Sequence, residues 1–522
     1  MLRWFSICLF IMASLICRAA DEHLTVSTKL GLLSGYENNG ISIWKGIPYA
    51  KAPVGDLRFR APQPMDPWQG VKACKEYCPT CVQYKGPLRD GQPEIEDCLY
   101  LNVWSPAADG KKRPVMVWIH GGGFIGGAGS NDMYEATKMS KRGDVVVVTI
   151  NYRLGPLGFL YFKDIAKGKE GFEDNLGIKD QVAALQWVKD NISAFGGDPN
   201  QVTIFGESAG AISVQTLMAV PAAEGLFQKA IVQSGNSDIL WSPQAATMVT
   251  KRYLELLKIS PDSLEALKRI DKDTLATYLT VLLKELFKEP KIMKLFAPTI
   301  DGEFIPEPIT TAIAKGASNH IPLLIGTNKD EANLFATKRL GLAPTNAKDL
   351  APYLLILNDS VRNKLISAYK AYPKRSGIMS LLTDATFAIP SIRFAEGHSL
   401  YAPTYMYRFD WSSFPLKLLK LGACHGIDIP FVFGNFGNGL GKRVTTLAAK
   451  KPIRRLSNEV QTAWINFAKT GNPNGKAVTE WPRYDAQQRQ TLVFGKKSKV
   501  QKDPKATERT AWEGVELISV SQ

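Results

Sequence analysis

The chain has 522 residues, of which 45% are hydrophobic and 22% charged, and its formal net charge is +15 at pH 7. This is the composition of an ordinary globular protein with a large core, and it excludes a collagen-like, low-complexity or disordered chain. Lys and Arg are spread along the sequence rather than gathered in one block, so the basic charge indicates a solvated surface and no nucleic-acid partner.

Residues 1–20 are typical of a signal peptide. Arg3 gives a positive start, residues 4–17 form an apolar run too short to span a bilayer comfortably, and Ala19 and Ala20 are small enough for cleavage. The alternatives are an uncleaved anchor or a lipoprotein site at Cys17, which the bulky Ile16 disfavours. We therefore expect a secreted or periplasmic protein with no integral membrane segment beyond the signal.

Five cysteines follow the predicted signal peptide: Cys74, Cys78, Cys81, Cys98 and Cys424. An exported protein meets oxidising conditions, so a disulfide is expected, and the odd number leaves at least one thiol unpaired. Cys78 and Cys81 in CPTC also match a redox C-x-x-C motif. Their flanks lack the βαβ pattern of a thioredoxin-like fold, which disfavours that function.

A strand buried on both faces is predicted at residues 113–120 (RPVMVWIH), and a glycine loop, GGGFIGGAG, follows it. Its glycines match G-x-G-x-x-G, the fingerprint of a dinucleotide-binding turn. That function requires a helix at the glycines and an acid at the end of the next strand. The loop instead continues into GSND, and the next strand ends in Asn151. The alternative, backbone N–H groups aimed at the oxyanion of an acyl-transfer reaction, is favoured.

A strand–helix rhythm continues through the first half of the chain. The segment DVVVVTINYR predicts a strand, NLGIKDQVAALQWVKDNISAF a helix, VTIF a strand, AISVQTLMAV a helix, and GLFQKAIVQSG another strand. Apolar strands without clean alternation are typical of strands buried on both faces. We expect a mostly parallel central sheet flanked by helices.

Residues 243–295 break this rhythm with consecutive helical patterns, and IPLLIG (321–326) and PTYMYRFDW (403–411) restore it with strands. A final helix is predicted at residues 456–474. Because no Ser/Gly-rich linker separates these segments, residues 21–522 are interpreted as a single domain with helical insertions.

The pentapeptide GESAG places Ser208 between the predicted strand VTIF and a predicted helix. This is the strand–turn–helix setting of a nucleophile elbow, in which small neighbours let strand and helix approach and leave the serine hydroxyl accessible. The alternative is a glycine-rich turn with an incidental serine. The setting favours a nucleophile.

A serine nucleophile needs a base, and the chain order serine, acid, histidine selects His425 on a late loop in ACHGID. His425 is also flanked by small residues. The acid must lie between the two, and GTNKDEANLF offers Asp330 and Glu331 just after a predicted strand. It would accept the second imidazole N–H and stabilise the imidazolium. Spacing alone does not separate Asp330 from Glu331.

From about residue 25 onwards the chain resembles the type-B carboxylesterases, which include cholinesterases and bacterial para-nitrobenzyl esterases. The resemblance rests on many motifs in order, among them WKGIPYAKAPVGDLRF, EDCLYLNVW, VWIHGGGFIGG, FGGDPNQVTIFGESAG, GTNKDEANLF and HGIDIPFVFG. It implies an α/β-hydrolase fold and hydrolysis of carboxylic esters through an acyl-enzyme intermediate, with a small-molecule ester as substrate. No metal or organic cofactor is implied.

The resemblance also implies roles for individual residues. Glu331 would be the catalytic acid beside Ser208 and His425, and the N–H groups of Gly122, Gly123 and Ala209 would form the oxyanion hole. Cys81 and Cys98 match the pair that forms an early disulfide. Four further residues match two buried salt bridges, Arg58 with Glu96 and Arg153 with Asp180.

Asp428 stands where the family commonly has Glu, and with Ser234 it is expected to support the histidine. Glu207, beside the nucleophile, has either an electrostatic role on His425 or a structural one.

The aromatic residues of the predicted Cys81–Cys98 loop bear on whether choline esters are substrates. Cholinesterases carry a tryptophan there to stack on choline, whereas Tyr84 is the only aromatic residue between Cys81 and Cys98. A choline-ester preference is therefore not expected. Two other functions are weighed against an esterase: a non-catalytic adhesion protein of the same fold, and a lipase that acts on aggregated long-chain esters. The sequence does not indicate the oligomeric state.

Overall fold

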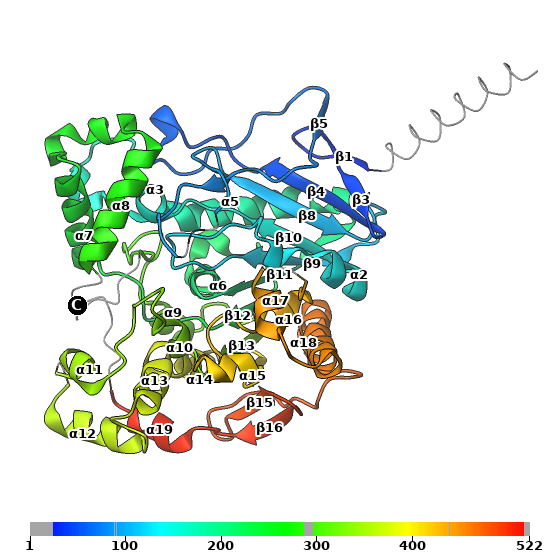
Figure 1. The fold of residues 1–522 in the computed structure, drawn as a ribbon. Helices are drawn as coiled ribbons and strands as arrows, with labels where there is room; N and C mark the ends of the chain where they lie inside the picture. Colours follow the sequence, from blue (N-terminus) through cyan, green and yellow to red (C-terminus); the bar gives the residue numbers. More distant parts are fainter. Residues whose placement is uncertain are drawn as a thin grey trace, which may run out of the picture.

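An 11-stranded sheet runs through the molecule in the order β16-β15-β14-β13-β12-β11-β9-β10-β8-β4-β3 (Figure 1). The computed structural model describes residues 24–515 except 88, 90, 287–295, 356 and 438. The predicted signal peptide lies outside the described residues. The strands of the large sheet are β3 (Tyr36–Asn38), β4 (Ile41–Pro48), β8 (Tyr100–Ser105), β9 (Arg113–Ile119), β10 (Val146–Ile150), β11 (Gly197–Glu207), β12 (Lys229–Gln233), β13 (Leu323–Asn328), β14 (Thr404–Phe409), β15 (Gln490–Phe494) and β16 (Lys499–Lys502).

The middle of this sheet is parallel, from β10 to β15, and its edges are antiparallel. Strand β9 shows that these central strands are buried on both faces of the sheet. Val115, Val117 and Ile119 face one hydrophobic cluster, while Met116 and Trp118 face a second cluster on the other side. A strand buried on both faces needs apolar residues at every position, as the sequence has. The predicted fold class, a mostly parallel sheet between helices, is confirmed.

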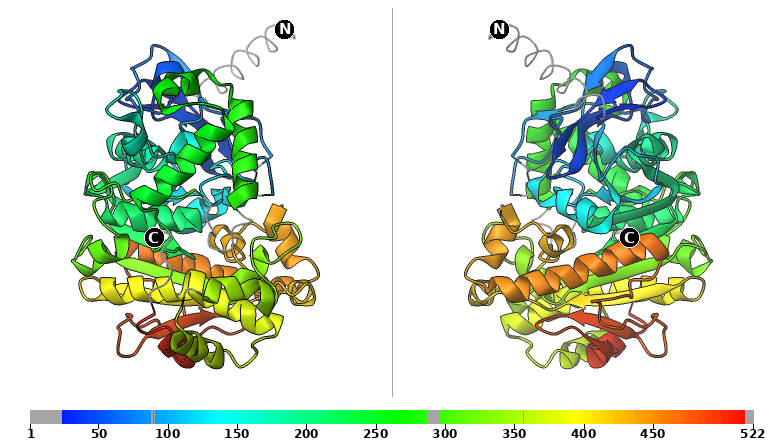
Figure 2. Two further views of the ribbon diagram at one scale, coloured as in Figure 1. Left: turned by 90° about the vertical axis from the view of Figure 1, so that its left-hand side faces the viewer. Right: turned by 90° about the vertical axis from the view of Figure 1, so that its right-hand side faces the viewer.

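Helices cover both faces of the sheet (Figure 2). The face that carries Val117 packs against α5, α6, α9 and α14, and the face that carries Trp118 packs against α2, α16 and α18. These layers explain why the long amphipathic α18 buries one side only. The bounds are α2 (Thr137–Gly143), α5 (Leu176–Asn191), α6 (Ala209–Ala219), α9 (Ile309–Ala314), α14 (Ile389–Ser399), α16 (Ile429–Phe433) and α18 (Lys450–Thr470).

The remaining helices occupy excursions from the sheet. Helices α7 and α8 lie in the predicted insertion 243–295, of which residues 287–295 are outside the description. The sequence patterns did not reveal α11, α12 and α13, which follow β13. The bounds are α3 (Gly155–Phe159), α4 (Lys163–Ala166), α7 (Pro243–Leu256), α8 (Lys272–Leu286), α10 (Ala332–Phe335), α11 (Ala347–Leu354), α12 (Asp359–Ala368), α13 (Arg375–Thr383), α15 (Phe414–Leu418), α17 (Gly439–Thr445) and α19 (Ala506–Ala511).

Two small sheets and a disulfide organise the N-terminal part. Strands β1 (Thr25–Ser27), β2 (Leu32–Ser34) and β5 (Val71–Ala73) form one sheet, and β6 (Thr80–Cys81) pairs with β7 (Glu94–Ile95). Cys81 and Cys98 are joined by a disulfide, and Cys78 is a free thiol. Cys78 and Cys81 therefore do not form a C-x-x-C disulfide.

Both salt bridges that the resemblance implied are present. Arg153 Nη2 lies 2.7 Å from Asp180 Oδ1, with both side chains buried. Arg58 Nε lies 2.7 Å from Glu96 Oε2, and its guanidinium also donates to the Leu267 and Ile270 carbonyls. Arg58 thereby ties the N-terminal part to the helical insertion.

Among the described residues, no helix is both long and apolar enough to cross a membrane.

Candidate active site

Ser208 stands at the sharp turn between β11 and α6. Its φ of +58° lies in a region that side chains rarely adopt, so the turn holds the residue in a strained conformation. The turn depends on two glycines. A Cβ on Gly206 would lie 2.5 Å from the Gly210 backbone, and a Cβ on Gly210 would lie 2.0 Å from the Ile119 carbonyl oxygen. Glycine at both positions therefore lets the strand, the helix and β9 meet.

Glu331 and His425 form a buried pair. Nδ1 of His425 lies 2.7 Å from Oε2 of Glu331, and the Glu331 side chain is fully buried. Oε1 of Glu331 accepts hydrogen bonds from the Ser234 hydroxyl at 2.5 Å and from the Asn328 N–H at 2.6 Å. With both carboxylate oxygens held, Glu331 fixes the orientation of the imidazole ring.

Asp330 has a different task, although it is only one residue away. Its Oδ2 accepts the N–H of Ala423 at 2.9 Å, and its own N–H donates to the Ala423 carbonyl at 2.9 Å. Asp330 thus straps the loop before His425 to the end of β13. The geometry separates the two acids that spacing left open, because only Glu331 contacts the imidazole.

The other imidazole nitrogen of His425 faces Glu207, at 3.2 Å from Oε1. That nitrogen has no hydrogen-bond partner, so the Ser208 hydroxyl and His425 are not hydrogen-bonded in this structure. His425 nevertheless lies at the Ser208 turn, because Glu207 is the residue directly before the serine. In free enzymes such hydrogen bonds are often long and tighten only with substrate present.

Burial and nearby charges shift the pKa values of both Glu207 and His425. Burial raises the pKa of the Glu207 carboxyl to about 8, and the nearby Asp428 and Glu331 carboxylates add to the increase. Burial opposes the charged form of His425, but Glu207 and Glu331 together outweigh it and raise its pKa to about 9. Groups this close titrate as a pair that shares protons.

The other described histidines lie in different settings. Burial lowers the pKa of His120 and of His398 to about 4, so both are neutral core residues. His120 stacks on Tyr152, and His398 contacts Thr404. His320 is exposed, and His23 lies outside the described residues. His425 is thus the histidine at the Ser208 turn.

The glycine loop after β9 lies against the same turn. A Cβ on Gly121 would be 3.1 Å from the Cβ of Ser208. Gly122 and Gly123 have φ values of +116° and +63°, and a Cβ on Gly122 would be 2.1 Å from the Gly126 carbonyl oxygen. Within the described residues, the N–H groups of Gly122, Gly123 and Ala209 donate no hydrogen bond. These three groups are therefore free to bind a ligand atom.

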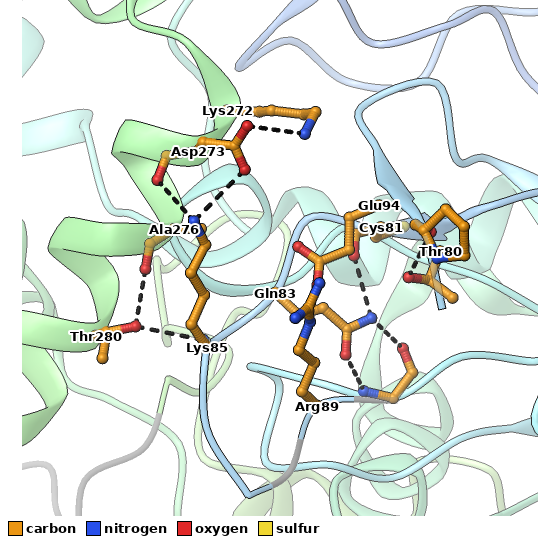
Figure 3. Close-up of polar contacts among 12 residues, drawn as sticks. Thr80, Cys81, Gln83, Lys85, Arg89, Glu94, Lys272, Asp273, Ala276 and Thr280 are labelled. Carbon is orange, nitrogen blue, oxygen red and sulfur yellow. Dashed lines mark hydrogen bonds and ion pairs between the residues drawn. The ribbon is translucent and has the colours of Figure 1, made fainter. Parts of the chain in front are cut away.

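Gln83, a residue that the sequence patterns did not single out, clamps this glycine loop. Its buried side chain donates to the Cys81 and Gly127 carbonyls and accepts the N–H of Gly127 at 3.0 Å (Figure 3). Gln83 lies in the loop closed by the Cys81–Cys98 disulfide. In that disulfide loop, the Lys85 N–H also donates to the Thr280 hydroxyl of α8 at 3.3 Å. The disulfide loop thus connects the glycine loop to the helical insertion.

Asp428 and Ser234, expected to act together, do not contact each other in the structure. Ser234 donates to Glu331, whereas Asp428 accepts from Gln233 at 2.9 Å, Tyr407 at 3.1 Å and Asn328 at 3.3 Å. They meet through Asn328, whose backbone N–H binds Glu331. The support of the acid is therefore a shared network rather than a direct pair.

Two remaining features bear on other chemistries. Burial raises the pKa of the Cys424 thiol to about 12, so this neighbour of His425 is a packed, unreactive group. Among the described residues, no cluster of three or more His, Cys, Asp or Glu side chains is arranged to hold a metal ion.

The fold, the serine elbow and the Glu331–His425 pair define a hydrolase of the α/β class. The carboxylesterase family model matches residues 22–512. Para-nitrobenzyl esterase of Bacillus subtilis is 42% identical over 93% of this chain and 98% of its own, and phenmedipham hydrolase of Pseudarthrobacter oxydans is 34% identical over 90% and 94%. The solved structure of carboxylesterase EST55 from Geobacillus stearothermophilus superposes with a TM-score of 0.84, at 40% identity, over 94% of this chain and 100% of its own.

The chain belongs to the carboxylesterase family. Its activity is the hydrolysis of carboxylic esters.

Proposed function

We propose that Ser208, His425 and Glu331 carry out this hydrolysis as a catalytic triad through an acyl-enzyme intermediate. The observation that carries the proposal is the 2.7 Å contact between Glu331 and His425 beside the strained Ser208 turn. His425 takes the Ser208 proton as the hydroxyl attacks the ester carbonyl, and then gives that proton to the leaving alcohol. A water molecule, activated by the same imidazole, releases the acid.

For this transfer, the Ser208 hydroxyl and Nε2 of His425 must come within hydrogen-bonding distance, which is not the case in the structure as it stands. Glu331 then stabilises the imidazolium at Nδ1, and Glu207, at 3.2 Å from Nε2, adds to this where it is ionised. The oxyanion is bound by the N–H groups of Gly122, Gly123 and Ala209, whose lack of protein acceptors supports this role. The loss of one such donor costs about 3–4 kcal/mol of transition-state stabilisation.

The decisive variant is Ser208→Ala. It should lower kcat for a para-nitrophenyl ester by about 10⁴-fold or more, because no other group supplies the nucleophile. Circular dichroism and the thermal midpoint should match those of the wild type. A folded variant with the wild-type rate would remove Ser208 from the mechanism.

We propose that the preferred leaving groups are small aromatic alcohols. Two rings flank His425, Phe335 at 5.1 Å and Phe387 at 4.8 Å between centroids. The leaving alcohol must lie beside His425, since His425 protonates it, and the rings provide an apolar contact there. The para-nitrobenzyl esterase relative agrees with this preference.

An ester panel that varies the acid and the alcohol separately tests the preference. Benzyl acetate should have a higher kcat/KM than ethyl acetate, and Phe387→Ala should reduce that ratio. The same panel with longer acyl chains separates an esterase, which saturates with dissolved short esters, from a lipase, whose rate rises once the substrate aggregates.

Export to the periplasm or the medium is the proposed location, and residues 21–522 are proposed to act as a single domain. The Cys81–Cys98 disulfide supports export, because such bonds persist in oxidising compartments. N-terminal sequencing of the protein recovered after expression and cell fractionation tests both the compartment and cleavage near Ala20. A protein that stays in the cytosol with residues 1–20 intact would contradict the proposal.

A further inference from the structure

A basic cavity lies behind the loops that carry Glu331 and His425. Its volume is about 660 Å³, and its walls come from the end of β13, the start of α13, helix α15 and the segment before α19. Asp330, one end of the Asp330–Ala423 contact described above, and Gly422, the residue before Ala423, form part of the wall. The cavity therefore lies on the outer side of that contact.

Cations dominate the lining of this cavity. Arg408 and Lys505 also line it, but they are neutralised by Asp410 and Asp384. Five other cations have no carboxylate partner within the described residues: Lys329, Lys374, Arg375, Lys417 and Lys420. Asp330 is the acidic residue in the lining, and its carboxylate already accepts the Ala423 N–H. The uncompensated charge calls for an anionic ligand with several negative groups.

Helix α15, which contributes Lys417 to the cavity, also carries large apolar side chains into solvent. Phe414, Leu418 and Leu419 are 74%, 72% and 68% exposed, while Leu416 on the same helix is buried and anchors it to the core. Exposed apolar side chains gathered on one short element mark an interaction surface. Here they stand directly beside the cation-lined cavity.

We propose that this face, made of α15, Leu419 and the basic cavity, binds anionic lipid membranes at their surface. Phe414, Leu418 and Leu419 enter the boundary between headgroups and acyl chains, and the cavity lysines bind lipid phosphates. Apolar anchors beside a basic patch are the two signals that stable interfacial binding requires. A dissolved polyphosphate would explain the cations but would leave the apolar side chains without a role.

Co-sedimentation with vesicles tests the proposal. The wild type should bind vesicles of phosphatidylglycerol and phosphatidylcholine in equal parts, and should not bind phosphatidylcholine alone. Lys417→Gln/Lys420→Gln should weaken the partition coefficient by about 25-fold, since each basic residue near the surface contributes about fivefold. Phe414→Ser/Leu418→Ser/Leu419→Ser should also lose most of the binding.

A matched control lies on and just after α7, where Lys251 and Lys258 are exposed and do not line this cavity. Lys251→Gln/Lys258→Gln removes the same charge and should keep wild-type vesicle binding. Every variant should hydrolyse a dissolved para-nitrophenyl ester at the wild-type rate, which shows that it is folded.

Three results would overturn the proposal. In the first, the control variant loses as much vesicle binding as Lys417→Gln/Lys420→Gln. In the second, the α15 variants bind as the wild type does. In the third, inorganic pyrophosphate raises the melting temperature through Lys417 and Lys420 while anionic vesicles bind no protein, which would make the cavity a site for dissolved anions.

Discussion

Glu207 and His425 face each other across 3.2 Å, on the imidazole nitrogen opposite to the one that binds Glu331. The imidazole therefore lies between two buried carboxyl groups. One of them belongs to Glu207, the residue directly before the proposed nucleophile in the chain.

The Glu207→Gln variant should shift the pH profile of the enzyme. Ionised Glu207 stabilises the imidazolium, and with Glu331 it raises the pKa of His425 to about 9. A protonated His425 is unable to act as a base, so activity is lost as the pH falls below that pKa. Without the Glu207 charge the pKa of His425 falls, and the acidic limb of kcat/KM should move to lower pH. Profiles that coincide would show that Glu207 is only structural. Glu224→Gln, at an exposed site, is the control.

The two adjacent acids should respond differently to loss of charge. Glu331→Gln removes the partner of Nδ1 and should lower kcat by about 10⁴-fold, as loss of the acid does in other triads. Asp330→Asn keeps the Glu331–His425 contact and should mainly lower the thermal midpoint, because it weakens the strap to Ala423. Single-turnover rates and melting curves of both variants separate the roles. The assignment is wrong if Asp330→Asn is the more damaging to kcat.

Gly210→Ala should destabilise the protein strongly. The new Cβ would stand 2.0 Å from the Ile119 carbonyl oxygen, so β9 and α6 would have to move apart. Overpacking of this kind costs about 1–3 kcal/mol or more. Gly397→Ala is the matched control in another helix, where the nearest atom would be 3.8 Å away. It should be neutral or stabilise by up to about 1 kcal/mol. Urea unfolding followed by fluorescence compares the two midpoints.

Removing one partner of the buried Arg153–Asp180 salt bridge should lower the free energy of unfolding far more than breaking a surface salt bridge does. Asp180→Ala leaves the Arg153 guanidinium buried without its partner, which costs about 3–5 kcal/mol. Asp190→Ala breaks the exposed contact with Lys29 and should cost about 0–1 kcal/mol. Equal shifts in the urea midpoint for both variants would show that the buried pair contributes no more than the surface one.

The sequence predicted the elements whose pattern is local. Runs such as VMVWI specify a strand buried on both faces, and GESAG between a strand and a helix specifies the elbow. Short antiparallel edge strands such as β3 and β16 have too few residues for an alternation of apolar and polar side chains to be recognised. The helices α11 to α13 also escaped the patterns.

Contacts between distant segments left no local pattern in the sequence, and those that were expected, such as the Arg153–Asp180 salt bridge, came from the family resemblance. Asp330 and Glu331 both follow β13, and only the direction of each side chain distinguishes them. Gln83 reaches Gly127 across 44 residues, and nothing around it in the sequence marks a clamp. The contact between Glu207 and His425 likewise depends on how the end of β11 meets the loop that carries His425.

The proposed catalytic groups follow four different strands of the large sheet: β9, β11, β13 and β14. Gly122 and Gly123, in the first quarter of the chain, can lie next to His425 only after the chain has been synthesised and folded past position 425. A nascent chain still attached to the ribosome would thus be inert toward esters until most of it had been synthesised. Recovery of turnover during refolding should accordingly report completion of the whole sheet, and not the docking of any one part.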